Sequence, residues 1–184
     1  MHLEKTDFTG LYVINPEIIE DNRGYFAELF RADLFKLEGV DIAFVQQNVS
    51  VSKTGVVRGL HFQWQPPLGK LVSVTEGRVF AVGVDLRKSS PTFKNFFALE
   101  LSRENKKRLY LSPGFAFGFG VVGGPAELEY LYTAPYNPQG ESNIIWDDKM
   151  IGINWPIKNP TLSIRDASAQ TLDEWLKRPE SNNF

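Results

Sequence analysis

Three polar side chains that can accept, donate or stabilise a proton lie among apolar neighbours in the sequence. Alternate residues of a β-strand face the same side, and this parity places each of the three on the apolar face of a predicted strand. They are His61, Lys70 and Tyr130, in the predicted strands Val57–Gln63, Lys70–Thr75 and Leu128–Thr133. A buried polar group without a partner costs about 1–3 kcal/mol. The three side chains therefore either satisfy one another structurally or line a cavity that holds a ligand.

The sequence offers few ligands for a metal ion. It contains two histidines, His2 and His61, and no cysteine. The absence of cysteine excludes zinc ribbons, iron–sulfur clusters, thiol nucleophiles and disulfide frameworks. A metal-binding cupin presents two histidines one residue apart with further histidine or carboxylate ligands, and this set cannot be assembled here. We therefore expect no metal and a solvated His2, and for His61 either catalysis or a hydrogen-bonded place in the core.

The composition indicates that short strands position these residues. Aromatic residues make up 13% of the chain, and 15 Gly and 11 Pro divide it into short segments, as an all-β sandwich or barrel requires. Eight strand patterns predict an all-β, double-sheet jelly roll, a cupin-like barrel. They are Phe44–Val51, Val57–Gln63, Lys70–Thr75, Val79–Leu86, Phe96–Leu101, Arg108–Leu111, Phe115–Val122 and Leu128–Thr133.

Helices and turns complete the predicted domain. The stretches Arg31–Leu37 and Ala167–Lys177 are predicted to be helical, the second with its apolar face on the outside of the sheets. Glu76-Gly77 is predicted to join two strands tightly, and Gly123-Gly124-Pro125 to separate two others. The length favours a single domain over residues 1–184, with residues 179–184 as a frayed tail.

The charge balance restricts the class of ligand. Lys and Arg number 20 against 22 Asp and Glu, which gives a formal net charge of −2, so the sequence lacks the basic surface that binds a nucleic-acid backbone. No apolar run approaches the roughly 20 residues of a membrane helix, and the first ten residues lack the apolar core of a signal peptide. We expect a cytoplasmic protein that binds a small ligand, and neither nucleic acid nor a membrane.

Several motifs follow one another between Leu3 and Trp175. The most extended are Arg23-Gly24-Tyr25-Phe26-Ala27-Glu28, Arg58-Gly59-Leu60-His61-Phe62-Gln63, Gly69-Lys70-Leu71-Val72, Val84-Asp85-Leu86-Arg87 and Leu162-Ser163-Ile164-Arg165-Asp166. In sequence and order they resemble the dTDP-4-dehydrorhamnose 3,5-epimerase family. The resemblance implies a jelly-roll homodimer with strand exchange that acts without a cofactor on nucleotide-linked 4-keto-6-deoxy sugars.

The resemblance also implies catalytic roles for four residues. A ketone at C4 acidifies the protons on C3 and C5, so epimerisation needs a base on one face, an acid on the other and a group that stabilises the enolate. By resemblance, His61 is the base and Asp166 is the carboxylate that orients it. Lys70 stabilises the O4 oxyanion, and Tyr130 is the acid.

Three of these assignments have alternatives. Asp166 is also placed to cap the helix predicted from Ala167, and Lys70 to form a salt bridge at the rim of the barrel. Tyr132 has the same strand parity as Tyr130, so parity alone does not decide which of the two tyrosines is the acid.

Substrate contacts follow from the same resemblance. The residues on substrate-contacting family positions are Arg23, Glu28, Gln46, Gln47, Asn48, Arg58, Glu141 and Arg165. Tyr136 stands on the family position that stacks against the nucleobase. Arginines suit a diphosphate because the guanidinium is planar and always charged. Arg58 and His61 differ by three positions, so simple alternation sends them to opposite faces of the strand. Either Gly59 carries a bulge, or Arg58 serves the partner subunit's site, which agrees with a strand-exchanged dimer.

Two positions depart from the family pattern. Phe117 stands where the family typically has a histidine, and Ala81 where an aspartate is expected. Phe117 shares parity with Phe115 and Phe119, so it either contacts the sugar or belongs to an aromatic wall that fills the barrel. Ala81 is expected to remove a second polar group from the cavity wall.

The leading hypothesis for function is epimerisation at C3 and C5, which converts dTDP-4-dehydro-6-deoxy-D-glucose to dTDP-4-dehydro-L-rhamnose. One alternative is a 3-epimerase or a relative that acts on a different nucleotide sugar. The other is a sugar-nucleotide binder without catalytic activity.

Overall fold

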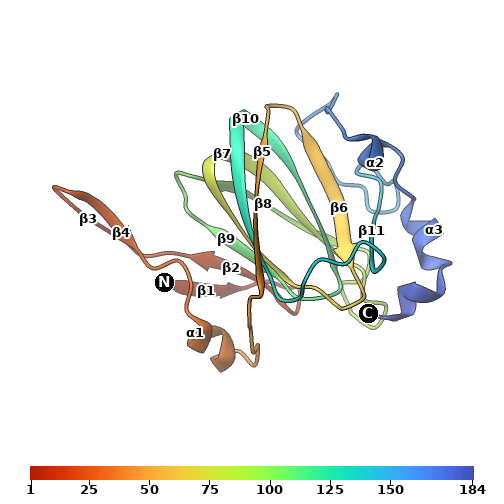
Figure 1. Cartoon of the computed structure of the whole chain (residues 1–184), viewed down its shortest axis with the longest axis horizontal. Coiled ribbons are helices and arrows are strands. Elements are labelled where there is room, and N and C mark those ends of the chain that lie inside the picture. Colours follow the sequence, from red (N-terminus) through yellow and green to blue (C-terminus); the bar gives the residue numbers. More distant parts are fainter.

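Two long strands organise the fold. The computed structural model describes residues 1–184, and hydrogen bonds join nine strands into one continuous sheet that folds into two layers (Figure 1). The strands β7 (Lys70–Asp85) and β10 (Phe115–Tyr132) run antiparallel, and each contributes one half to each layer. The protein is therefore all-β with two facing layers, as the composition predicts.

Shorter strands complete the two layers. The first layer contains the C-terminal half of β7 and the N-terminal half of β10, together with β6 (Val57–Gln63), β8 (Phe96–Ser102) and β11 (Glu141–Asn143). The second layer contains the other halves, together with β1 (His2–Lys5), β2 (Leu11–Asn15), β5 (Gln46–Ser52) and β9 (Arg108–Leu111).

The two turns predicted inside the long strands are wrong. Strand β7 continues through Glu76-Gly77, and β10 continues through Gly123-Gly124-Pro125. The pairing register of β7 and β10 shifts near these residues, and a Cβ on Gly77 would lie 2.2 Å from the carbonyl oxygen of Pro125. The glycine therefore permits a close approach of two strands at the place where they pass from one layer to the other.

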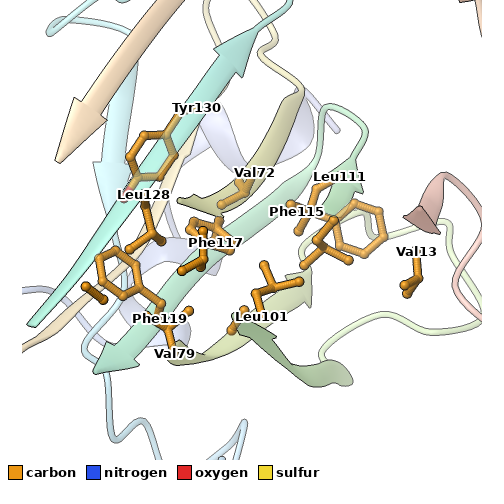
Figure 2. Close-up of a cluster of buried hydrophobic side chains, with 14 of the residues drawn as sticks. Val13, Val72, Val79, Leu101, Leu111, Phe115, Phe117, Phe119, Leu128 and Tyr130 are labelled. Atoms are coloured by element: carbon orange, nitrogen blue, oxygen red, sulfur yellow. The ribbon is translucent and has the colours of Figure 1, made fainter. Parts of the chain in front are cut away.

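The largest apolar core lies between the layers. It contains 16 buried residues, among them Leu109 on β9. Figure 2 shows Leu101 from the first layer and Leu111 from the second in this core. Each fully buried large apolar side chain contributes about 1.5–3 kcal/mol. This core therefore holds the two layers, and the polar groups between them, at a fixed separation.

Aromatic residues of β10 form part of this core. Phe115, Phe117 and Phe119 lie in the same cluster (Figure 2), and the ring centroids of Phe117 and Phe119 are 6.2 Å apart. The predicted aromatic wall is therefore present. Ala81 is fully buried opposite Phe119 and does not line the cavity described below, so its expected place on the cavity wall is wrong.

The C-terminal segment covers the outer face of the first layer. A second core of 13 buried residues lies there, and the ring of Trp175 meets that of Phe62 on β6 edge-on at 4.7 Å between centroids. The helix predicted over Ala167–Lys177 is instead two short helices, α2 (Ile164–Ala167) and α3 (Leu172–Leu176). Each begins at its own hydroxyl cap, Ser163 for α2 and Thr171 for α3.

The end of the chain is packed against the domain, so the predicted frayed tail is wrong. Pro179–Asn182 forms a 3-10 turn in which Ser181 is fully buried. The Nζ atom of Lys88 donates hydrogen bonds to Ser181 Oγ at 2.8 Å and to Asn182 Oδ1 at 2.7 Å. These contacts and the burial of Ser181 anchor the last turn.

The remaining elements lie beside the second layer. Helix α1 (Ala32–Leu37) is found where it is predicted, and its Phe35 packs into a third core on the outer face of this layer. The strands β3 (Ile18–Asp21) and β4 (Gly24–Ala27) pair only with each other and extend away from the layers (Figure 1). None of the helices has the length and apolar character needed to cross a membrane.

Candidate active site

A cavity of about 210 Å³ gathers most of the predicted site residues. Those that line it are Arg58, His61, Lys70, Phe117, Tyr130, Tyr136, Glu141 and Arg165. Ser50, Gln63, Phe119 and Tyr132 line it as well. Strand alternation places Gln63 on the same face as His61, and Phe119 on the same face as Phe117, so both could be predicted from the sequence. Ser50 could not, because only the pairing of β5 with β10 brings it to the cavity. Three cationic side chains against one carboxylate in the lining favour an anionic ligand.

His61 and Asp166 form the shortest contact at the cavity. His61 lies on β6, and its Nε2 is 2.6 Å from Oδ1 of Asp166 in α2. The hydroxyl of Ser163 caps α2 by accepting a hydrogen bond from the backbone N–H of Asp166. The capping role considered for Asp166 is therefore wrong, and its carboxylate is free to bind the imidazole.

The Asp166 carboxylate selects the tautomer of the His61 imidazole. Burial opposes ionisation of Asp166, but hydrogen bonds from His61, Ser163 and Asn143 outweigh this effect and hold its pKa below the usual value. An ionised carboxylate accepts a hydrogen bond, so Nε2 of His61 carries the proton that points toward Asp166. No group of the protein hydrogen-bonds Nδ1, which leaves this nitrogen as the basic one.

Lys70 is buried beside the same histidine. Its Nζ atom donates a hydrogen bond to the backbone carbonyl of His61 at 2.9 Å, and the rings of Phe117 and Tyr132 each lie 6.0 Å from it. Only 8% of Lys70 is exposed, and burial lowers its pKa to about 8. It forms no salt bridge, so the alternative of a rim ion pair is wrong. A cation of this kind is suited to stabilise a negative oxygen in the cavity.

Two tyrosines of β10 face the cavity, as their parity predicts. The hydroxyl of Tyr130 lies 2.9 Å from Ser50 Oγ, and burial raises the pKa of Tyr130 to about 12. Burial also raises the pKa of Tyr132, and the two ring centroids are 6.3 Å apart. Both phenols are therefore protonated at neutral pH, and both are positioned to donate a proton or a hydrogen bond.

A bulge in β6 brings Arg58 to the same cavity as His61. On β10, Phe117 pairs with His61 and Phe119 with Arg58, so three steps of β6 oppose two steps of β10. Gly59 has φ +134°, and a Cβ on it would lie 2.5 Å from Gly118 Cα. Of the two alternatives for Arg58, the bulge at Gly59 is the one found in the structure.

Polar contacts hold Tyr136, the residue predicted to stack against the nucleobase, at the edge of the cavity. Tyr136 donates a hydrogen bond from its hydroxyl to Glu141 Oε1 at 2.5 Å, and Glu141 pairs with Arg165 at 2.7 Å. Gln46 accepts a hydrogen bond from the backbone N–H of Tyr136 at 2.8 Å and donates to Asn48 Oδ1 at 3.1 Å. Gln46 therefore holds the Tyr136 loop in place, and neither Gln46 nor Asn48 lines the cavity.

Three predicted contact residues lie away from the cavity of their own chain. Gln47 is exposed, and alternation along β5 turns it to the face opposite Gln46 and Asn48. Arg23 lies at the tip of the β3–β4 hairpin and pairs with Asp21 at 2.5 Å, while Glu28 follows β4. The structure contains no group of three or more His, Cys, Asp or Glu side chains placed to hold a metal ion.

Comparison with known proteins assigns the family. Residues 5–174 match the family model described as dTDP-4-dehydrorhamnose 3,5-epimerase. The chain belongs to this family. The dTDP-4-dehydrorhamnose 3,5-epimerase of Methanothermobacter thermautotrophicus is 44% identical over 154 residues, which are 84% of this chain and 83% of that protein. Membership of the family makes the chain an isomerase of the class that acts on sugar nucleotides.

Solved structures of related epimerases have the same fold. The dTDP-6-deoxy-D-glucose-3,5-epimerase of Legionella pneumophila Philadelphia 1, in complex with dTDP-4-keto-L-rhamnose, matches with a TM-score of 0.91 and 41% identity, over 98% of this chain and 96% of that one. A 3′-monoepimerase from Streptomyces bikiniensis, in complex with dTDP-quinovose, matches with a TM-score of 0.86 and 33% identity, over 92% and 87%. The fold is therefore common to enzymes that invert one carbon and enzymes that invert two.

Proposed function

We propose that the chain inverts C3 and C5 of a dTDP-linked 4-keto-6-deoxy sugar, converting dTDP-4-dehydro-6-deoxy-D-glucose to dTDP-4-dehydro-L-rhamnose. The observation that carries the proposal is the His61–Asp166 pair at 2.6 Å in one cavity with Lys70 and Tyr130. Family membership supports the class of substrate. The donor set also supports a reaction without a metal or cofactor, because base, acid and oxyanion holder are all side chains.

The proposed mechanism begins with proton abstraction. Nδ1 of His61 removes the proton from the carbon next to the C4 ketone, and Asp166 stabilises the imidazolium that forms. The electron pair moves to O4, where the buried ammonium of Lys70 stabilises the oxyanion. The hydroxyl of Tyr130 then protonates the carbon from the opposite face, which inverts the centre. A positioned proton transfer of this kind contributes about 10²–10⁴-fold to the rate.

The nucleotide is proposed to lie toward the Tyr136 end of the cavity. Arg58 and Arg165 line it with guanidinium groups that fit a diphosphate in a bidentate way. Glu141 holds Arg165 and the Tyr136 hydroxyl together, so it orients the diphosphate ligand and the stacking ring at the same time. Asn48 and Gln46 support this arrangement from β5.

We also propose that the active form is a homodimer in which the β3–β4 hairpin reaches the cavity of the other subunit. The hairpin exposes large apolar side chains, with Tyr25 at 58% and Phe26 at 68% exposure. It carries Arg23 and leads to Glu28, which lie away from the cavity of their own chain. Strand β5 has one unpaired edge, which is available for pairing with another chain.

Complementation between two inactive variants tests the dimer. A subunit with His61→Asn and a subunit with Arg23→Glu each lack one group, but a mixed dimer contains one complete site if Arg23 acts across the interface. Co-expression should restore about a quarter of the wild-type activity, because about half of the dimers are mixed and each has one working site of two. A monomer by light scattering, or no restored activity, contradicts the proposal.

Deuterium exchange tests the reaction itself. The protein is incubated with dTDP-4-keto-6-deoxyglucose in D₂O, and exchange at C3 and C5 is followed by NMR. Exchange with inversion at both carbons supports the proposal. Exchange at C3 alone identifies a 3-epimerase, an alternative suggested by Phe117, which stands where the family typically has a histidine. Binding without exchange identifies a sugar-nucleotide binder without catalytic activity.

The variant His61→Asn identifies the base. It should abolish exchange at every carbon and leave nucleotide binding nearly intact. The matched control is His2→Asn, because His2 is the other histidine of the chain and is exposed on β1. Retained exchange in His61→Asn would remove His61 from this role.

A further inference from the structure

A serine on β5 is the hydrogen-bonding partner of the Tyr130 hydroxyl. The distance from Ser50 Oγ to the Tyr130 oxygen is 2.9 Å, and neither hydroxyl has another partner in the chain. Both residues line the cavity. Tyr130 is buried, whereas Ser50 is half-buried. The serine is thus the one protein group in hydrogen-bonding contact with the proposed acid.

The pairing of β5 with β10 produces this contact. Tyr130 lies directly opposite Asn48, and Leu128 lies directly opposite Ser50. Ser50 is therefore the diagonal neighbour of Tyr130 on the cavity face, within reach of a long side chain. The position is defined by strand register, and a shift of one residue would turn Ser50 to the other face.

We propose that Ser50 is a positioning residue for proton donation by Tyr130, an inference that rests on the function proposed above. When Tyr130 protonates the substrate, its O–H bond breaks and the electron pair of the enolate forms the new C–H bond. The tyrosine is left as a phenolate. Ser50 orients the phenol before the transfer and donates its own O–H to the phenolate afterwards, keeping its proton.

The burial of Tyr130 explains why such a donor is needed. Burial raises the pKa of Tyr130 to about 12, while the hydrogen bond with Ser50 and the charge of Arg58 lower it and the neighbouring Tyr132 raises it further. A hydrogen bond to a charged oxygen is stronger than one to a neutral oxygen. Ser50 therefore stabilises the developing phenolate more than the phenol, and only such differential stabilisation accelerates the step.

The decisive experiment is a double-mutant cycle with Ser50→Ala and Tyr130→Phe. In the wild-type background, Ser50→Ala should lower kcat for product about tenfold or more, with KM changed less than twofold and His61-dependent exchange retained. Ser50→Thr keeps the hydroxyl and should restore kcat to within about threefold. In the Tyr130→Phe background, Ser50→Ala should not lower kcat further, because the effects of two substitutions that act through one group are not additive.

The control is Ser73→Ala, which removes a different serine hydroxyl, one that accepts a hydrogen bond from Arg108 and does not line the cavity. It should leave kcat unchanged. An unchanged kcat in Ser50→Ala overturns the proposal. An equal loss of kcat on Ser50→Ala in the wild-type and Tyr130→Phe backgrounds also overturns the proposal, because Ser50 would then act independently of Tyr130.

A measurement without substrate separates this inference from the proposed function. The six tyrosines are replaced by 3-fluorotyrosine, and the Tyr130 resonance is assigned by its loss in Tyr130→Phe. Ser50→Ala should shift this ¹⁹F resonance and raise the pKa of its phenol, whereas Ser73→Ala should change neither. An unchanged resonance overturns the role of Ser50, and a wild-type protein without any turnover overturns the proposed function instead.

Discussion

Replacing Lys70 with methionine should stabilise the protein while it removes activity. Burial lowers the pKa of Lys70 from 10.5 to about 8. Each pKa unit corresponds to about 1.36 kcal/mol, so folding with a charged Lys70 costs about 3 kcal/mol at pH 7. Methionine keeps the apolar stem and removes this cost, but it loses the hydrogen bond to the His61 carbonyl, worth about 1 kcal/mol. The free energy of unfolding should rise by about 2 kcal/mol and Tm by about 4–8 °C.

The stabilisation by Lys70→Met should disappear as the pH rises. Between pH 8 and 10.5 the unfolded chain binds a proton on Lys70 that the folded chain has lost, so the wild-type free energy of unfolding increases with pH in this window. Methionine does not titrate. The difference between the two proteins should therefore be largest below pH 8 and close to zero or reversed near pH 10.5. Thermal unfolding at a series of pH values, with epimerisation assays on the same samples, measures both effects.

Lys53→Met is the matched control, because Lys53 is exposed and lies directly after β5. It should leave Tm, its pH dependence and activity unchanged. A Lys70→Met protein that is less stable than wild type at pH 7, or equally affected at pH 7 and pH 10, would refute the argument from burial. Full activity in this variant would refute the role of Lys70 as the holder of the oxyanion.

Four further predictions concern the site. Asp166→Asn keeps the shape but removes the charge beside His61, and it should lower kcat about 10–100-fold with little change in KM, because a charge-assisted hydrogen bond is lost. Tyr130→Phe should impair product formation more than solvent exchange; if Tyr132→Phe does so instead, Tyr132 is the acid. Phe117→His should raise kcat/KM for dTDP-4-keto-6-deoxyglucose several-fold if the ring faces the sugar, and an unchanged or lower value with an intact fold favours a purely structural wall. Activity should survive EDTA; loss that a divalent ion restores would contradict a metal-free mechanism.

The sequence was informative where a single strand decides the outcome. Alternation alone predicts that His61, Lys70 and Tyr130 share the interior with apolar neighbours, and all three line the cavity. Strands Val57–Gln63 and Arg108–Leu111 have the predicted bounds. Parity could do this because it depends only on the pleat of the backbone, which is the same in every strand.

The sequence was less informative where a turn signal and a bulge contain the same residues. Glycine permits both a tight turn and a bend inside a strand, so Gly77 predicts a break although β7 continues through it. The same ambiguity applied at Gly59, where only the pairing with β10 shows that the strand is bulged and that Arg58 and His61 face one cavity. Contacts across long separations, such as Ser50 with Tyr130, depend on register and have no local signal.

The two-layer architecture itself provides groups on opposite sides of a ligand. His61 lies on β6 in the first layer, whereas Lys70 begins β7 and Tyr130 lies near the end of β10, both in the second layer. Under the proposed mechanism, a sugar ring held between the layers would therefore meet the proposed base, His61, from one layer and the proposed acid, Tyr130, from the other, as inversion at carbon requires. The separation of these groups is set by the core of 16 residues between the layers, so a cavity-forming substitution in that core, such as Leu109→Ala, should alter proton transfer even without touching the site.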